Sequence, residues 1–156
     1  IAAGPLPGGT QATVALAAGP EGAPFGLRQA GSHRGFERTG TPGTFHHAEL
    51  HTPDPALSDP FYERVFGYTV RDPAPGLRTW RPPAGHRRTE LARRPVPAPP
   101  ARLLPHFACA DTAALCAEAV RLGGRVQGGP HPSPYGPLAV LADDQGAVFA
   151  VCAPGA

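Results

Sequence analysis

The sequence contains no lysine, no asparagine and no methionine, and its single isoleucine is Ile1. All fourteen basic residues are therefore arginine. The codons of the missing residues are rich in A and T, so the pattern indicates a GC-rich bacterial gene. The abundance of arginine, alanine, proline and glycine thus reflects the genome, and it carries little information about function.

Long apolar segments are also lacking, and this predicts that the chain has no membrane-spanning helix. The start has no charged segment of the kind that precedes a secretory leader. The net charge of +2 does not indicate a nucleic-acid partner. The three cysteines contain no Cys-x-x-Cys pair and lie in apolar segments, which favours reduced, buried thiols and a cytoplasmic chain.

An internal repeat divides the chain. Residues 15–27 (ALAAGPEGAPFGL) align without gaps with residues 139–151 (AVLADDQGAVFAV), and each copy is typical of a strand, a glycine turn and a second strand. The offset of 139 − 15 = 124 residues is too long for a solenoid and suits a duplicated domain. We therefore expect residues 1–31 to be the terminal hairpin of a similar upstream domain, residues 32–43 a linker, and the chain a truncated product.

The segment after residue 44 begins with an alternating strand, Phe45–Thr52, which places His47, Glu49 and His51 on one face. A short helix is predicted to start with Asp59 as its N-cap and Pro60 in its first turn, because Pro60 is unfavourable inside a helix. Its core face includes Phe61, Val65 and Phe66, and it ends at Gly67. Three strands are expected at residues 68–71, 77–81 and 87–91, and a proline-rich crossover at residues 95–100.

The second half repeats this plan. It has a strand at residues 103–110, a helix at residues 113–122 capped by Asp111 or Thr112, and strands at residues 125–127, 138–142 and 148–152. The apolar stripe of that helix consists of Leu115, Ala119 and Leu122. The sequence therefore predicts an α+β fold of two βαβββ modules, residues 44–100 and 101–156, with a curved, mixed sheet forming a cup and helices on its outer face.

Two stretches carry a family resemblance. Residues 46–70 (HHAELHTPDPALSDPFYERVFGYTV) are similar to the opening strand and helix of the vicinal-oxygen-chelate superfamily, which includes glyoxalases, bleomycin-resistance proteins and extradiol dioxygenases. Residues 104–126 and 134–151 resemble the start and the closing hairpin of its second module. The likeness is strongest to tandem bacterial members described as glyoxalases or hydroxylases. It implies pairing of modules, and hence a homodimer.

The resemblance also locates a possible metal site. Metal-dependent members place one ligand on the first and last strand of each module, and the first two positions fall on His47 and Glu90. The other two fall on Leu104 and Ala150, whose side chains cannot coordinate a metal. This implies a domain without a cofactor that binds a small hydrophobic or aromatic metabolite.

The alternative is a shifted metal site. His106 lies two residues beyond Leu104 and so shares its face of the strand. His47, Glu90 and His106 would form a two-histidine, one-carboxylate set for a divalent ion such as Fe, Zn, Ni or Mn. A lyase or dioxygenase would then be expected.

The remaining candidates each have two interpretations. Trp80 is expected either to line the cup or to pack in the core. Tyr135 is expected either to place its hydroxyl over the cup or to anchor its own turn. The histidines are expected either to contact a ligand or to form hydrogen bonds with backbone groups. The expected ligand-binding set is His47, Glu49, His51, Trp80, Glu90, His106 and Tyr135. The arginine cluster Arg87, Arg88, Arg93 and Arg94 indicates either a solvated edge strand or an anion site, and Cys109 and Cys152 are expected in the core.

Overall fold

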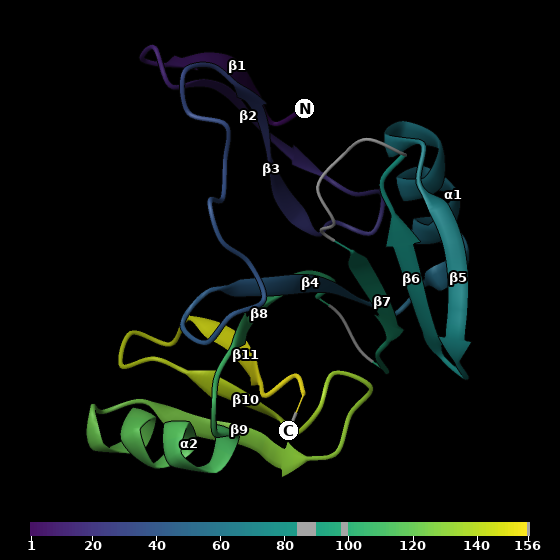
Figure 1. Cartoon of the computed structure of the whole chain (residues 1–156). Helices are drawn as coiled ribbons and strands as arrows, with labels where there is room; N and C mark the ends of the chain where they lie inside the picture. Colours follow the sequence, from purple (N-terminus) through teal and green to yellow (C-terminus); the bar gives the residue numbers. More distant parts are fainter. Residues whose placement is uncertain (84–89, 98–99, 156) are drawn as a thin grey trace. The chain divides into compact units, whose positions relative to one another are not determined.

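The computed structural model describes residues 1–83, 90–97 and 100–155. The chain divides into two compact units (Figure 1). Unit 1 comprises residues Ile1–Glu37 and Glu49–Leu103, and unit 2 comprises residues Arg38–Ala48 and Leu104–Ala156. No helix within the described residues is long and apolar enough to cross a membrane.

The expected α+β fold of two strand–helix–three-strand modules is confirmed. Eight strands of the modules follow the order β5-β6-β7-β4-β8-β11-β10-β9 in one mixed sheet. The first module consists of β4 (Phe45–Thr52), α1 (Pro55–Phe66), β5 (Thr69–Ala74), β6 (Leu77–Arg81) and β7 (Leu91–Pro95). The second consists of β8 (Arg102–Ala108), α2 (Thr112–Arg121), β9 (Arg125–His131), β10 (Leu138–Ala142) and β11 (Val148–Cys152).

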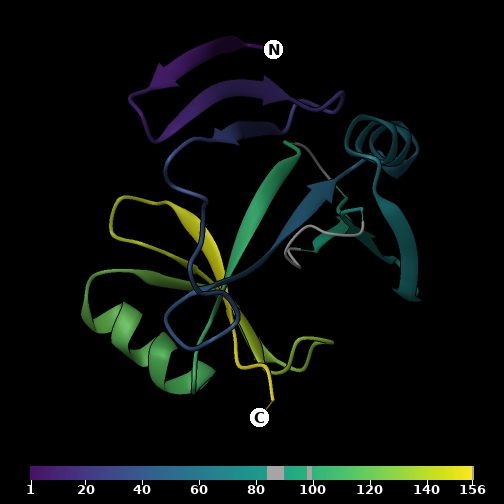
Figure 2. The ribbon, with the colours of Figure 1, turned by 45° about the horizontal axis from the view of Figure 1, so that its top comes forward.

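The N-terminal residues form a separate sheet of three strands, β1 (Ala3–Gly8), β2 (Ala12–Ala18) and β3 (Pro24–Ala30), drawn in purple in Figure 2. The expected hairpin corresponds to β2 and β3, and β1 is an addition that the sequence did not suggest. The pairing repeats that of β9–β11. Ala15 lies opposite Leu27 as Ala139 lies opposite Val151.

The repeat extends to an irregularity in the strands. The register between β1 and β2 shifts between Ala3 and Leu6, and the register between β9 and β10 shifts at the corresponding place. Gly4 and Gly129 occupy this place with φ of +91° and +85°. A Cβ atom at Gly129 would lie 2.4 Å from the Leu138 carbonyl oxygen, so only glycine allows the two strands to approach this closely.

The expected start of the first helix is wrong. The helix begins at Pro55, with Asp54 as the N-cap whose carboxylate accepts the Leu57 amide at 3.1 Å, and Pro60 lies inside it. Proline suits the first position because its missing N–H would have no partner there. Pro60 removes one later hydrogen bond. Ser58 compensates by bonding to both the Thr52 hydroxyl and the Asp54 carbonyl, which ties the first turn to β4.

Two further expectations in this module need correction. The last strand is Leu91–Pro95, whereas it was expected at residues 87–91, of which residues 87–89 lie outside the described part of the chain. Pro95 is the last residue of this strand. Val65 is 58% exposed, whereas Phe61 and Phe66 pack against the core of unit 1 as expected.

The core of unit 1 joins α1 to both sheets of that unit. Tyr62 and Trp80 are fully buried and stack with ring centroids 5.3 Å apart. Phe25 of β3 lies 6.0 Å from the rings of Tyr62 and Phe66. The Tyr62 hydroxyl donates to Glu21, and burial together with this carboxylate raises the pKa of Tyr62 well above its ordinary value. The first three strands therefore pack onto α1 of the same chain.

The core of unit 2 lies between α2 and its sheet. Cys116 of α2 packs with Leu141 and Val151, and Cys109 joins the same cluster. All three cysteines are buried and free, as the sequence predicted. In α2, Asp111 is the N-cap and accepts the Ala114 amide at 3.0 Å, while Leu122 at the end of the expected stripe is 63% exposed.

Candidate functional site

Strand β4 supplies the polar face that the alternation predicted. His47 and Glu49 are each only 3% exposed, and His51 is half-buried. Leu50, on the other face, is fully buried in the core of unit 1. Burial of three polar side chains in one strand is costly unless each finds polar partners, so their contacts determine what the site can do.

Three rings meet at His47 within unit 2. His106 comes from β8, where it lies opposite Ala150 of β11, and it is 1% exposed. The ring of His47 lies 4.1 Å from the ring of His106 and 4.1 Å from the ring of Tyr135. Tyr135 is carried by the loop between β9 and β10, which Ser133 braces through hydrogen bonds to the Tyr135 amide and the Gly136 carbonyl. His47 is thus held between two flat rings.

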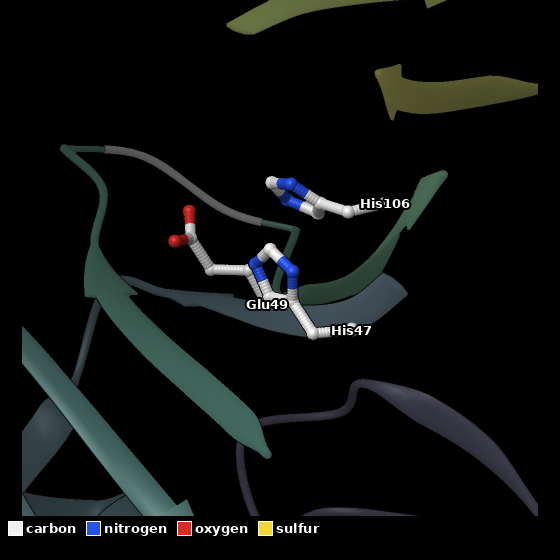
Figure 3. Close-up of side chains that lie close together, drawn as sticks. All are labelled: His47, Glu49 and His106. Atoms are coloured by element: carbon white, nitrogen blue, oxygen red, sulfur yellow. The ribbon is translucent and has the colours of Figure 1, made fainter. Parts of the chain in front are cut away.

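His47, Glu49 and His106 each offer one possible metal ligand atom, and these atoms lie within 4.8 Å of one another (Figure 3). The set has the predicted composition of two histidines and one carboxylate. Its carboxylate is Glu49, whereas the sequence suggested Glu90. Glu90 instead accepts a hydrogen bond of 2.5 Å from the Arg81 guanidinium.

The Glu49 carboxylate already has strong partners. Arg94 donates from Nε to Oε1 at 2.9 Å and from Nη2 to Oε2 at 3.4 Å. The His51 ring nitrogen Nε2 donates to the same Oε1 at 2.8 Å. A forked guanidinium contact neutralises a carboxylate and occupies both of its oxygens. A metal ion would have to displace Arg94 before Glu49 could coordinate it fully.

The four-ligand arrangement expected from the resemblance does not fit this chain. Leu104 is 1% exposed and Ala150 is fully buried, so two of the four positions are apolar and closed to solvent. In the possible ligand group found among the described residues, the imidazole nitrogens come from His47 and the shifted His106. Two imidazoles without a free carboxylate form a poor centre for a divalent ion.

Trp80 and Arg93 are buried and do not lie on an exposed surface that could bind a ligand. Trp80 donates from Nε1 to Glu63 at 3.2 Å, and its full burial supports the core-packing interpretation. The solvated-edge interpretation is wrong for Arg93, which is 8% exposed and makes a forked ion pair with Asp59 at 2.9 and 2.6 Å. Arg87 and Arg88 lie outside the described residues. The role of Arg94 at Glu49 was missed, because nothing local in the sequence indicates a partner 45 residues away.

Comparison with known proteins gives one family. Residues 47–152 match the family described as "Glyoxalase-like domain". "Putative glyoxylase CFP32" of Mycobacterium tuberculosis is 37% identical over 139 residues, which cover 86% of this chain and 53% of that protein. "Anthracycline biosynthesis protein DauV" of Streptomyces sp. is 33% identical over 143 residues, which cover 88% of this chain and 51% of that protein. The chain thus spans about half the length of these relatives.

Solved structures share the fold at low identity. A methylmalonyl-CoA epimerase from Mycobacterium tuberculosis superposes with a TM-score of 0.54 at 11% identity, over 72% of this chain and 88% of that chain. The epimerase from Streptomyces coelicolor gives a TM-score of 0.53 at 16% identity, over 74% and 97%. At these identities the likeness shows the fold alone.

Proposed function

Because this chain belongs to the glyoxalase-like domain family, we propose that it binds a small hydrophobic or aromatic metabolite without a metal cofactor, at the rings of His47, His106 and Tyr135. The observation that carries the proposal is the state of Glu49. This carboxylate, which is grouped with the two histidines, is neutralised by Arg94 and bonded to His51. We expect the organic molecule to contact the rings of these histidines.

The ring cluster has the chemistry of such a site. Small-molecule sites combine apolar and aromatic surface with a few fixed polar atoms. The two imidazoles and the phenol provide π faces, ring nitrogens and one hydroxyl in a buried setting, and Leu104 and Ala150 are buried apolar residues of the same unit. The relative named for anthracycline biosynthesis supports a small organic ligand.

A second candidate is a metal-dependent lyase or dioxygenase of the same family. It is favoured by the 4.8 Å grouping of His47, Glu49 and His106, a set typical of sites for ions such as Fe²⁺. When bound, the metal would act as a Lewis acid on substrate oxygens. Arg94 would then serve as the residue that releases Glu49.

Metal analysis separates the two candidates. The purified chain would be incubated with Zn²⁺, Ni²⁺, Mn²⁺ or Fe²⁺, desalted and analysed for bound metal. The metal-free proposal predicts no stoichiometric retention, and a thermal-shift screen of small aromatic metabolites should then give hits that His106→Ala removes. His131→Ala, a change at an exposed histidine of the same unit, is the matched control and should keep them.

The variant Arg94→Gln gives a second test that distinguishes the metal-free from the metal-dependent candidate. Removing the guanidinium takes away both Arg94 contacts of Glu49 and leaves the His51 contact on Oε1, so this variant should bind divalent ions more tightly than the original chain. About one ion per original chain, lost in His106→Ala but kept in His131→Ala, would overturn the metal-free proposal and establish the second candidate.

A further inference from the structure

Unit 2 contains a groove that the histidine cluster does not use. It lies between α2 and the hairpin of β10 and β11, and its volume is about 340 Å³. Figure 1 shows α2 packed along the sheet of this unit. The floor is apolar and is formed by Leu115 and Ala119 of α2, Leu141 of β10 and Phe149 of β11. The volume lies within the range typical of sites for small organic molecules.

The groove in unit 2 is open because α2 and β10 carry smaller side chains than the equivalent positions of α1 and β6 in unit 1. When the helices are aligned on their N-caps, Asp54 and Asp111, Tyr62 of α1 corresponds to Ala119 of α2. Trp80 of β6 similarly corresponds to Leu141 of β10. In unit 1 the two aromatic rings stack and fill the space between helix and strand. In unit 2 the same space lacks both rings.

Phe25 and Phe149 extend this comparison. They are equivalent in the internal repeat, and each packs against the helix of its own unit. Around Phe25 lie the rings of Phe61, Tyr62 and Phe66, whereas Phe149 lines an open groove. Protein interiors are otherwise densely packed, so an apolar space of this size is suited to an aromatic guest.

The rim of the groove is acidic. Glu118, Asp143 and Asp144 line it, and no basic side chain does so among the described residues. Asp143 accepts the amides of the β10–β11 turn, and Glu118 is paired with Arg121, three residues further along α2. Asp144 is exposed beside the apolar floor. A negative rim next to an apolar floor attracts a molecule with a hydrophobic body and one positive charge.

We propose that this groove is a second binding site of the chain, specific for a small organic cation with an aromatic body. The ring system would lie on Ala119, Leu141 and Phe149, and the ammonium group would point to Asp144. The site lies on the helix side of the unit 2 sheet and does not depend on the function proposed for His47 and His106.

Three probes with one ring system and different charges test the proposal: naphthylmethylamine, naphthylmethanol and naphthoate. Each would be titrated into the ¹⁵N-labelled full chain and followed by the amide signals of Ala119, Leu122 and Asp144. We expect saturable shifts with the amine, and binding weaker by about fivefold with the alcohol and more with naphthoate. Asp144→Asn should weaken amine binding by about fivefold and leave alcohol binding unchanged.

Ala119→Phe places a ring in the groove and should abolish binding of the amine, while Val120→Ala, at an exposed neighbouring position, should not change it. Unchanged far-ultraviolet circular dichroism shows that the variants are folded. Equal affinity for the three probes, retention of binding in Ala119→Phe, or shifts confined to His47 and His106 would overturn the proposal. It would also be overturned if light scattering showed that Ala119→Phe abolishes a dimer, because the groove would then hold a second copy.

Discussion

Replacing Asp59 by alanine should lower the free energy of unfolding of unit 1 by about 3–5 kcal/mol. Asp59 accepts two hydrogen bonds from Arg93, at 2.9 and 2.6 Å, and a third contact of 2.9 Å from Arg78. Both members of the Arg93 pair are almost inaccessible to solvent, at 8% and 9% exposure. The pair links α1 to β7 across the interior of the unit.

The size of this loss in the free energy of unfolding depends on the arginine charges that lose their partner when Asp59 is replaced by alanine. Arg78 retains Glu63 and Asp72 as partners, so its charge stays compensated. Arg93 is left with its charge in a poorly solvated position, and this uncompensated charge dominates the cost. Replacing both residues by leucine removes the charge as well as the pair. The double variant should therefore recover most of the stability lost in Asp59→Ala.

Urea unfolding followed by tryptophan fluorescence measures this effect. Trp80 is the only tryptophan and is fully buried in unit 1, so its emission reports the unfolding of that unit. Asp72→Ala removes an exposed partner of Arg78 and is the matched control, for which we expect a much smaller loss. A loss below about 1 kcal/mol in Asp59→Ala, or a double variant as unstable as the single one, would refute the reasoning.

Four other predictions concern stability and assembly. Asp111→Ala should destabilise unit 2 by about 1 kcal/mol in thermal unfolding, because the Ala114 amide loses its cap; no change would contradict this role. Gly129→Ala should cost more than about 1 kcal/mol in the same assay, because the methyl group would collide with the Leu138 carbonyl at a positive φ. Burial raises the pKa of Cys152 from 9.0 to about 11. Since the folded state thus favours the thiol, its contribution to stability should persist below pH 9 and fall between pH 9 and 11, in a pH series of melting temperatures with Cys152→Ala as the reference. The expected homodimer should scatter light as twice 16.1 kDa, and a mass of 16.1 kDa would contradict it.

Strands with a clear alternation and nearby turn residues could be predicted to the residue. The bounds of β4, β6, β10 and β11 match the expectation, since a period of two is a local property of the sequence. The first helix and the last strand of its module could not be placed so well. Pro60 is unfavourable in a helix considered alone, and the structure shows that the side-chain contacts of Ser58 with Thr52 and Asp54 stabilise the earlier start.

The composition of the candidate site could be predicted, but its electrostatics could not. Alternation along β4 and β8 was enough to bring His47, Glu49 and His106 under consideration. Whether Glu49 is available depends on Arg94, which is distant in sequence and belongs to a cluster that suggested a solvated edge. Arg93 in the same cluster is buried for the same reason, a distant carboxylate. Long-range ion pairs leave no periodic signal in a sequence.

The N-terminal sheet shows that the two copies of the sequence repeat also share their strand pairing. Every described pairing between β10 and β11 has its equivalent between β2 and β3, and the glycine-dependent irregularity recurs as well. Such agreement in register goes beyond the four identities in the sequence. That residues 1–31 are the end of an upstream domain of the same kind stays a prediction. Phe25 has kept the role of Phe149, packing against a helix, but its helix is α1 and its surroundings are filled with aromatic rings. The two copies therefore differ in the space beside the helix. That space is closed in unit 1 and open in unit 2, which is why a second ligand is expected only at α2.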